Sequence, residues 1–208
     1  MDLRYYGGNC VDITHKGRRI VIDDNLTDLG AKSVIKADDV ALYTSFHAGI
    51  RDTGLTFDGP GEYEVADISI KGFATRAHID EPEQKSITMF KLIMSDESIL
   101  FTGHIYPQLS EAQLESIGVV DILVIPVGGN GYTLDPVGAL KIIKLIEPKL
   151  IIPTHYDDPA LNYPVPQQTL ENALKEMSIE AKETVAKLRI KPGELADVMQ
   201  LVVVEKAT

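Results

Sequence analysis

The hydrophobic periodicity changes along the chain, and this change constrains the fold more than any other feature. Through residue 102, short β-branched and aromatic runs such as Leu3 to Tyr6 alternate with clusters of Gly, Asp and Glu. After residue 110, strand-like runs at 121–127 and 150–153 enclose an amphipathic helical stretch at 134–146. A β-rich front followed by alternating strands and helices predicts two packed sheets flanked by helices, an α/β four-layer αββα sandwich.

The whole of 1–208 is predicted to be one domain. No linker, low-complexity tract or internal repeat divides the sequence, and its 208 residues suffice for one sizeable core. Within this domain we expect a loop with a short helix at 25–37, further helices at 110–117 and 167–177, and closing strands at 185–190 and 199–204.

Composition excludes several classes of partner. Lys and Arg total 20 against 31 Asp and Glu, and the resulting net charge of -11 disfavours nucleic acid. No apolar run approaches the length of a membrane span, and the single cysteine, Cys10, fits a reducing compartment, so we expect a cytoplasmic protein. A small-molecule substrate is the expected partner, since one cation in a pocket can outweigh a distant, screened field. Assembly into a homo-oligomer is compatible with the sequence.

Four of the five histidines stand at or just after the ends of predicted strands. If those ends meet along one edge of the sandwich, the imidazoles converge, and neutral imidazoles bind zinc, manganese, iron or nickel. The fifth, His15, is expected at the surface in a hairpin turn. A histidine is more often a hydrogen-bonded group than a ligand, so an empty pocket remains the alternative. The four candidates are His47, His78, His104 and His155.

Several segments resemble one known family, the metallo-β-lactamase superfamily. The resemblance is to its stand-alone metal-dependent hydrolase branch, which includes ascorbate-6-phosphate lactonase-like proteins, and it covers nearly the whole chain. It implies the αββα fold and metal-dependent hydrolysis. The matching segments are Tyr6-Gly7-Gly8-Asn9-Cys10, Val21-Ile22-Asp23, Gly59-Pro60-Gly61-Glu62-Tyr63, Val124-Ile125-Pro126-Val127-Gly128-Gly129 and Ile152-Pro153-Thr154-His155-Tyr156.

The family's HxHxDH metal motif is degenerate in this chain. At its place the sequence reads Ser45-Phe46-His47-Ala48-Gly49-Ile50, so only the second histidine is kept. The resemblance also implies a ligand at His78 and at His155, which are retained. Where the family has a bridging aspartate after a glycine, this chain has His104.

A dinuclear centre needs bridging anions to offset the repulsion between its two ions, and both usual aspartates are missing. We therefore expect at most one divalent metal, with zinc ahead of manganese, iron and nickel, or no metal. Three imidazoles would leave a position for an activated water, whereas a fourth from His104 would close the site.

Other residues are candidates for supporting roles, and no catalytic residue is assigned. The resemblance suggests that Asp23 accepts a hydrogen bond from a ligand histidine. Asp80 is a candidate proton shuttle by its nearness in sequence to His78, and Tyr132 and Tyr156 are candidates for the substrate rim. Two functions stay open: a divergent hydrolase of a small, anionic substrate, or a non-catalytic binding or assembly module.

Overall fold

The computed structural model describes residues 1–45 and 53–207. Six strands form the first sheet, in the order β13-β1-β2-β3-β4-β5. Strands β13, β1, β2 and β3 are antiparallel neighbours, and β3, β4 and β5 run parallel. The bounds are β1 (Asp2–Gly7), β2 (Cys10–His15), β3 (Arg18–Ile22), β4 (Val40–Leu42), β5 (Leu55–Phe57) and β13 (Leu188–Arg189).

Eight strands form the second sheet, in the order β12-β14-β11-β10-β9-β8-β7-β6. Strands β6 to β9 are antiparallel neighbours, whereas β9, β10, β11, β14 and β12 run parallel. The bounds are β6 (Gly61–Val65), β7 (Ile68–Thr75), β8 (Ile87–Met94), β9 (Glu97–Phe101), β10 (Ile122–Pro126), β11 (Leu150–Thr154), β12 (Glu183–Val185) and β14 (Gln200–Val204).

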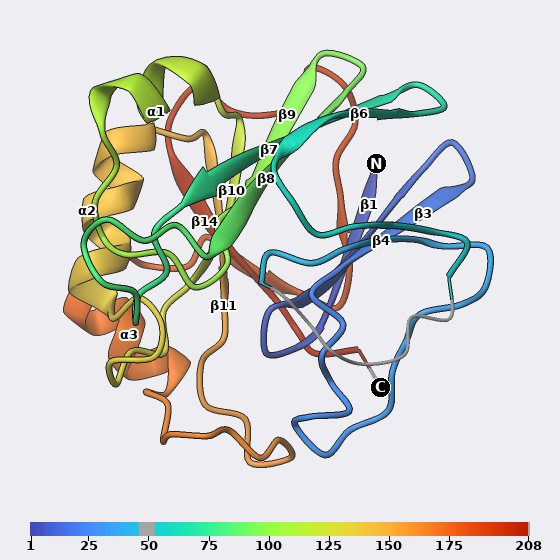
Figure 1. Cartoon of the computed structure of the whole chain (residues 1–208). Coiled ribbons are helices and arrows are strands. Elements are labelled where there is room, and N and C mark those ends of the chain that lie inside the picture. The colour runs from blue at the N-terminus through green and yellow to red at the C-terminus, as the bar shows by residue number, and fades with distance from the viewer. Residues whose placement is uncertain (46–52, 208) are drawn as a thin grey trace.

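Three helices cover the outer face of this second sheet (Figure 1). They are α1 (Glu111–Ile117), α2 (Pro136–Ile146) and α3 (Leu170–Met177). Each begins at a side chain that accepts a backbone N–H: Ser110, Asp135 and Thr169 respectively. The predicted helical stretches at 110–117 and 134–146 are therefore confirmed, and the third helix starts three residues later than its predicted start at Gln167.

Strand β10 shows why the central strands read as continuous apolar runs. Ile122 and Val124 face the core between the sheets, whereas Leu123 and Ile125 pack against the helices. Because both faces are buried, the strand shows no polar alternation. The two sheets thus enclose one core, and the helices enclose a second against the eight-stranded sheet.

The outer face of the six-stranded sheet differs from the prediction. The short helix expected within 25–37 is not formed; that segment has turns and irregular backbone. Its Leu26 packs on Cys10 and Val21. The carboxylate of Asp24 accepts hydrogen bonds from two backbone amides of this segment, which satisfies locally the groups that a helix would pair.

The predicted closing strand at 185–190 is also wrong as a single element. It is two short strands, β12 and β13, in different sheets: Glu183–Val185 pairs with β14, and Leu188 pairs with Leu3 of β1. The chain passes from one sheet to the other between them. No helix in the described part of the chain is long and apolar enough to cross a membrane.

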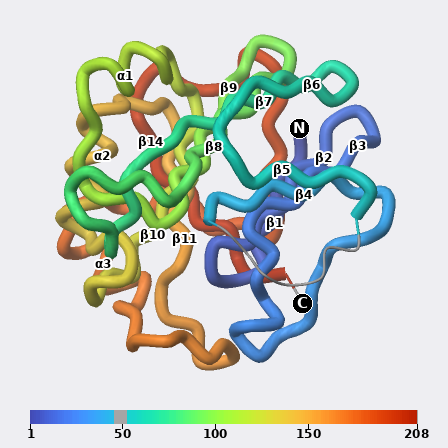
Figure 2. The backbone as a smooth tube through the Cα atoms, in the orientation of Figure 1, coloured from blue at the N-terminus to red at the C-terminus, as the bar shows by residue number. Residues whose placement is uncertain are grey.

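Two loops lie side by side where the sheets meet (Figure 2). The loop after β3 and the loop after β11 are joined by a hydrogen bond from Asn162 N to Leu29 O of 2.9 Å. The backbone N–H of His155 donates to Gly8 O in the β1–β2 turn, at 2.8 Å. The end of β11 is therefore held against the first sheet.

Candidate functional site

Two imidazoles meet at the carboxyl ends of the parallel strands. His155 follows β11 directly, and His104 stands three residues after the end of β9. Their ring centroids are 4.6 Å apart and their planes make an angle of 85°. The prediction that strand-terminal histidines converge is confirmed for this pair.

Gln167 fixes the tautomer of His155. The Gln167 Nε2 donates to Val165 O at 2.9 Å, so its Oε1 faces Nδ1 of His155 at 3.1 Å. Nδ1 therefore carries the proton, and Nε2 keeps its lone pair. Burial lowers the pKa of His155 to about 4, so the ring is neutral at physiological pH.

Asn9 reaches across from the first sheet to His104. Its Nδ2 lies 3.2 Å from His104 Nε2, and its Oδ1 accepts a hydrogen bond from Thr154 Oγ1 at 3.0 Å. His104 keeps part of its surface at a cavity, and its Nδ1 is buried with no hydrogen-bond partner among the described residues. Burial, followed by the neighbouring imidazoles, holds the pKa of His104 well below its usual range.

His78 and His104 line a cavity of about 240 Å³. The backbone N–H of His78 donates to His104 O at 2.7 Å, and His78 Nδ1 is another buried imidazole nitrogen without a partner in the part of the chain that the structure describes. Burial lowers the pKa of His78 as well. The ring of Tyr132 stands edge-on to His104 with centroids 4.8 Å apart, at the cavity wall. The cavity is lined by Ser45, Ala77, His78, Ile79, Ser86, Ile87, His104 and Tyr132.

Two glycines allow these close approaches. A Cβ at Gly128, after β10, would overlap with His155 O and with Gln167 Oε1. A Cβ at Gly103, which has φ 61, would overlap with Thr44 Oγ1. Glycine at both positions is therefore a steric requirement of the site.

The predicted supporting carboxylates have other partners. Asp23 accepts from the backbone N–H and the hydroxyl of Thr44, each at 2.7 Å, and burial raises its pKa to about 6 despite these bonds. Asp80 accepts from Ala77 N at 2.8 Å and from Ser86 Oγ at 2.7 Å. Both carboxylates order backbone segments beside the histidines.

Tyr156 and His15 also have definite places. The ring of Tyr156 packs at 5.6 Å on that of Tyr5, a residue of the core between the sheets, and burial raises its pKa to about 12. The prediction that His15 lies at the surface is wrong: its exposed fraction is 8%. It ends β2, and its Nε2 lies 3.6 Å from a carboxylate oxygen of Asp67, in the turn between β6 and β7.

The described residues supply only part of a ligand set for a metal. A neutral imidazole nitrogen with a free lone pair can bind a divalent ion, and Nε2 of His155 is such a nitrogen. However, no group of three His, Cys, Asp or Glu able to hold an ion occurs within 1–45 and 53–207. His47, the fourth candidate, lies outside the described residues. A mononuclear site would need a ligand from there, and the engaged Asp23 and Asp80 offer no bridging anion.

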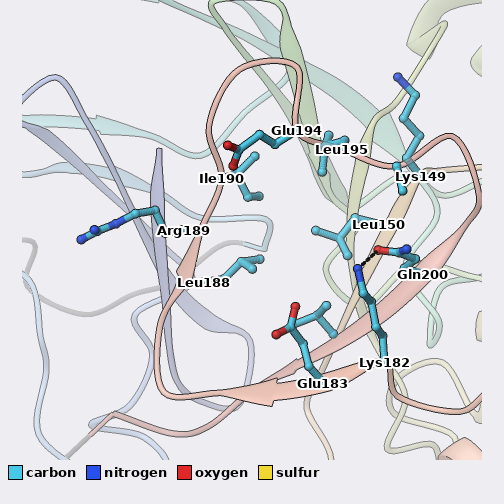
Figure 3. A pocket seen from close by; sticks show the side chains of 12 residues that line it. Lys149, Leu150, Lys182, Glu183, Leu188, Arg189, Ile190, Glu194, Leu195 and Gln200 are labelled. Carbon is cyan, nitrogen blue, oxygen red and sulfur yellow. Dashed lines mark hydrogen bonds between the residues drawn. The ribbon is translucent and has the colours of Figure 1, made fainter.

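A separate cavity of about 120 Å³ opens near the amino ends of β11 and β14 (Figure 3). Its floor includes Leu150 and Leu188, and Lys182 donates to Gln200 at 2.8 Å across its mouth. Leu150 begins the strand that ends before His155, so this cavity is at the opposite end of the sandwich.

Sequence reasoning missed Asn9 and Gln167 as site residues. Asn9 follows two glycines in a tight turn. This position in the sequence is a signal that could have marked Asn9 as a candidate site residue. Gln167 lies in the loop before α3, twelve residues from His155, and no local pattern marks it.

Comparisons with known proteins agree with this architecture. A family model described as a β-lactamase superfamily domain matches residues 2–155. A UPF0173 protein of Pyrococcus abyssi is 26% identical over 184 residues, which covers 75% of this chain and 83% of that protein. A UPF0173 metal-dependent hydrolase of Carboxydothermus hydrogenoformans is 38% identical over 68 residues, which covers 33% of this chain and only 30% of that protein.

Solved structures share the fold. A protein of Thermotoga maritima, provisionally assigned as a zinc-dependent hydrolase of the metallo-β-lactamase superfamily, has a TM-score of 0.74 at 24% identity, covering 98% of both chains. An isothiocyanate hydrolase from Delia radicum gut bacteria has a TM-score of 0.66 at 12% identity, covering 100% of this chain and 97% of that chain. The predicted sandwich of two sheets flanked by helices is therefore confirmed.

Proposed function

The chain belongs to the metallo-β-lactamase superfamily, and from this premise we propose that it is a divergent hydrolase of a small, anionic substrate, with at most one divalent metal. The observation that carries the proposal is the state of His155. The Oε1 of Gln167 accepts a hydrogen bond from the Nδ1–H of His155, and burial keeps the ring neutral. Its Nε2 therefore has a lone pair, and the ring lies beside that of His104. A histidine that binds a metal is usually oriented in this way by its other nitrogen.

The candidate ligands are the imidazoles of His155, His78 and His47, with zinc the first metal to test and manganese, iron and nickel as alternatives. A divalent ion there would supply Lewis acidity toward a carbonyl or phosphoryl group. His104 is less available, because Asn9 occupies its Nε2. Low pKa values suit ligands better than general bases, which work best with a pKa near the operating pH.

Metal content is the first test. We expect protein purified without chelators to hold about one equivalent of a single transition metal, and its melting temperature to rise when zinc or manganese is restored after chelation. His155→Ala and His78→Ala should lower the content, whereas His15→Ala, at the far end of β2, should leave it unchanged. Content below about 0.2 equivalents, with no thermal response to either metal, would contradict the metal proposal.

Hydrolysis is tested separately with a panel that pairs phosphorylated lactones and phosphate esters with their uncharged counterparts. The lactonase-like branch that the sequence resembles motivates the lactones. We expect turnover of at least one anionic member by the wild type and its loss in His155→Ala. Turnover that is equal in the two proteins would refute a role for this imidazole.

A non-catalytic binding module is the second candidate, favoured by the Asn9–His104 hydrogen bond and by the engaged carboxylates. It predicts that a His47→Ala, His155→Ala double variant folds and keeps every interaction of the wild type. Loss of a bound metal together with loss of a measured activity would refute it.

A further inference from the structure

The segments that carry His78 and His104 run side by side in opposite directions. Ala77 and Ile105 form an antiparallel bridge, and Tyr106 N donates to Arg76 O at 2.9 Å. Ala77 and Ile105 are buried in the core beneath the helices. Because side chains alternate along extended backbone, the residues on either side of this pair share the opposite face. That face carries Arg76, His78, His104 and Tyr106.

Two cavities are lined by neighbouring residues of these segments. The histidine cavity of about 240 Å³ is followed by one of about 250 Å³, whose lining includes Arg76, Lys85 and Tyr106. The three segments that line the first continue into the second: 75–76 precede 77–79, 82–85 precede 86–87, and 106 follows 104. A ligand against the histidines can therefore extend toward Arg76.

The guanidinium of Arg76 is held in place by a backbone oxygen and an aromatic ring, and the Asp80 carboxylate interacts with its charge from beyond ion-pair distance. Its Nε and Nη2 donate to the backbone oxygen of Asp80 at 3.0 and 2.8 Å, and its Cζ lies 3.7 Å from the centroid of the Tyr106 ring. No carboxylate of the described residues lies within ion-pair distance of Arg76 or of Lys85, although the chain has 31 acidic residues. Nη1 forms no hydrogen bond to any part of the chain that the structure describes.

We propose that Arg76, assisted by Lys85, binds an anionic group of the substrate, a phosphate or a carboxylate, while the rest of the substrate lies against His78 and His104. Alternate residues of an extended segment are about 7 Å apart, which sets the span between the anionic group and the reacting bond. A guanidinium already oriented by Tyr106 and Asp80 loses little freedom when it binds such a group. This inference rests on the proposed function, because it names the substrate class of the same site.

Binding of simple probes tests the subsite without turnover. Inorganic phosphate and glutarate are titrated separately, with glycerol as the neutral control, while backbone amide chemical shifts report binding in every variant and the Nε–H signal of Arg76 reports it in the wild type. We expect saturation by phosphate or by glutarate at millimolar concentration, and the probe that saturates identifies the anion. Arg76→Gln should weaken that binding about tenfold or more, and Lys85→Gln several-fold. Lys141→Gln, which removes an exposed charge on α2, should leave it unchanged.

The outcome separates this inference from the hydrolase proposal. If neither probe saturates below about 50 mM, or if Arg76→Gln and Lys141→Gln weaken binding equally, the subsite is refuted, whatever the enzyme hydrolyses. Arg76→Lys keeps the positive charge but loses the paired N–H donors of the guanidinium, so this variant should bind the anion with intermediate strength. Because Arg76 also orders the Asp80 backbone, each variant's melting temperature is measured, and exposed Lys85 provides an independent test if Arg76→Gln unfolds.

Discussion

The ring of His155 stands edge to face with the ring of His104, with centroids 4.6 Å apart, although the two residues are 51 positions apart in the sequence. The parallel pairing of β9, β10 and β11 produces this contact, because it brings the carboxyl ends of these strands to one edge. Asn9 contacts the ring of His104, and Gln167 contacts the ring of His155. The site therefore depends on four chain segments and both sheets.

Acid should destabilise the protein through His155. Burial lowers its pKa in the folded state to about 4, whereas the unfolded ring takes up a proton near its ordinary value of 6.5. The unfolded state thus binds more protons between these values, so the contribution of His155 to stability is full above 6.5 and decreases toward pH 4. Urea unfolding from pH 7.5 to 4.5 measures this slope, which should be shallower in His155→Gln.

Asp23 should act in the opposite direction. Its pKa is raised to about 6 by burial, so between pH 6 and 3.8 the folded state holds a proton that the unfolded state has lost. The contribution of Asp23 to stability therefore increases as the pH falls through 6. Asp23→Asn should remove this gain, whereas Asp96→Asn, at an exposed turn, should keep it. An unchanged pH profile in Asp23→Asn would contradict the raised pKa.

Replacing Gln167 should change the chemistry of His155 without moving its backbone. A carboxylate in Gln167→Glu would stabilise the protonated imidazole and raise the pKa of His155. Gln167→Met removes the acceptor, leaves Nδ1 unsatisfied and should cost about 1–3 kcal/mol of stability. Imidazole ¹⁵N chemical shifts report both tautomer and pKa. If neither variant alters those shifts, the hydrogen bond assigned here does not set the tautomer.

Gly128→Ala should be strongly destabilising. The added methyl would overlap with His155 O and Gln167 Oε1, both held by other contacts, so the loop after β10 would have to move. We expect a loss of about 1–3 kcal/mol or more in the free energy of unfolding. Gly54→Ala is the matched control, because no atom of the described residues lies within 4 Å of a Cβ there. Equal melting temperatures for the two variants would rule out the close approach.

Asp80→Asn should lower the free energy of unfolding and leave the pH dependence of any hydrolysis unchanged. Burial alone would raise the pKa of Asp80, but the hydrogen bonds from Ala77 and Ser86 outweigh it and lower the pKa. Its contribution is therefore full above the unfolded value and is lost as the pH falls through the lowered pKa. We expect a loss of about 1–3 kcal/mol at neutral pH. A normal melting temperature with a shifted pH–rate profile would favour the proton-shuttle role instead.

The sequence by itself determined the layers of the fold. Alternating and continuous apolar runs identified most strands, and the amphipathic stretch at 134–146 identified α2, because these signals are local. Predictions from local sequence signals were wrong where pairing between distant segments determines the structure. The run at 185–190 divides between two sheets, and His15 is buried beside Asp67.

The sequence also predicted that strand-terminal histidines would gather, and the family resemblance led to the interpretation that the metal motif is degenerate. Only the tertiary structure decided how those histidines are used. It placed Gln167 beside His155, Asn9 beside His104 and Thr44 beside Asp23, and it placed Arg76 at a second cavity with no ion pair to the described residues. Strand propensity depends on near neighbours, whereas proton position and charge pairing depend on groups that folding brings from distant segments.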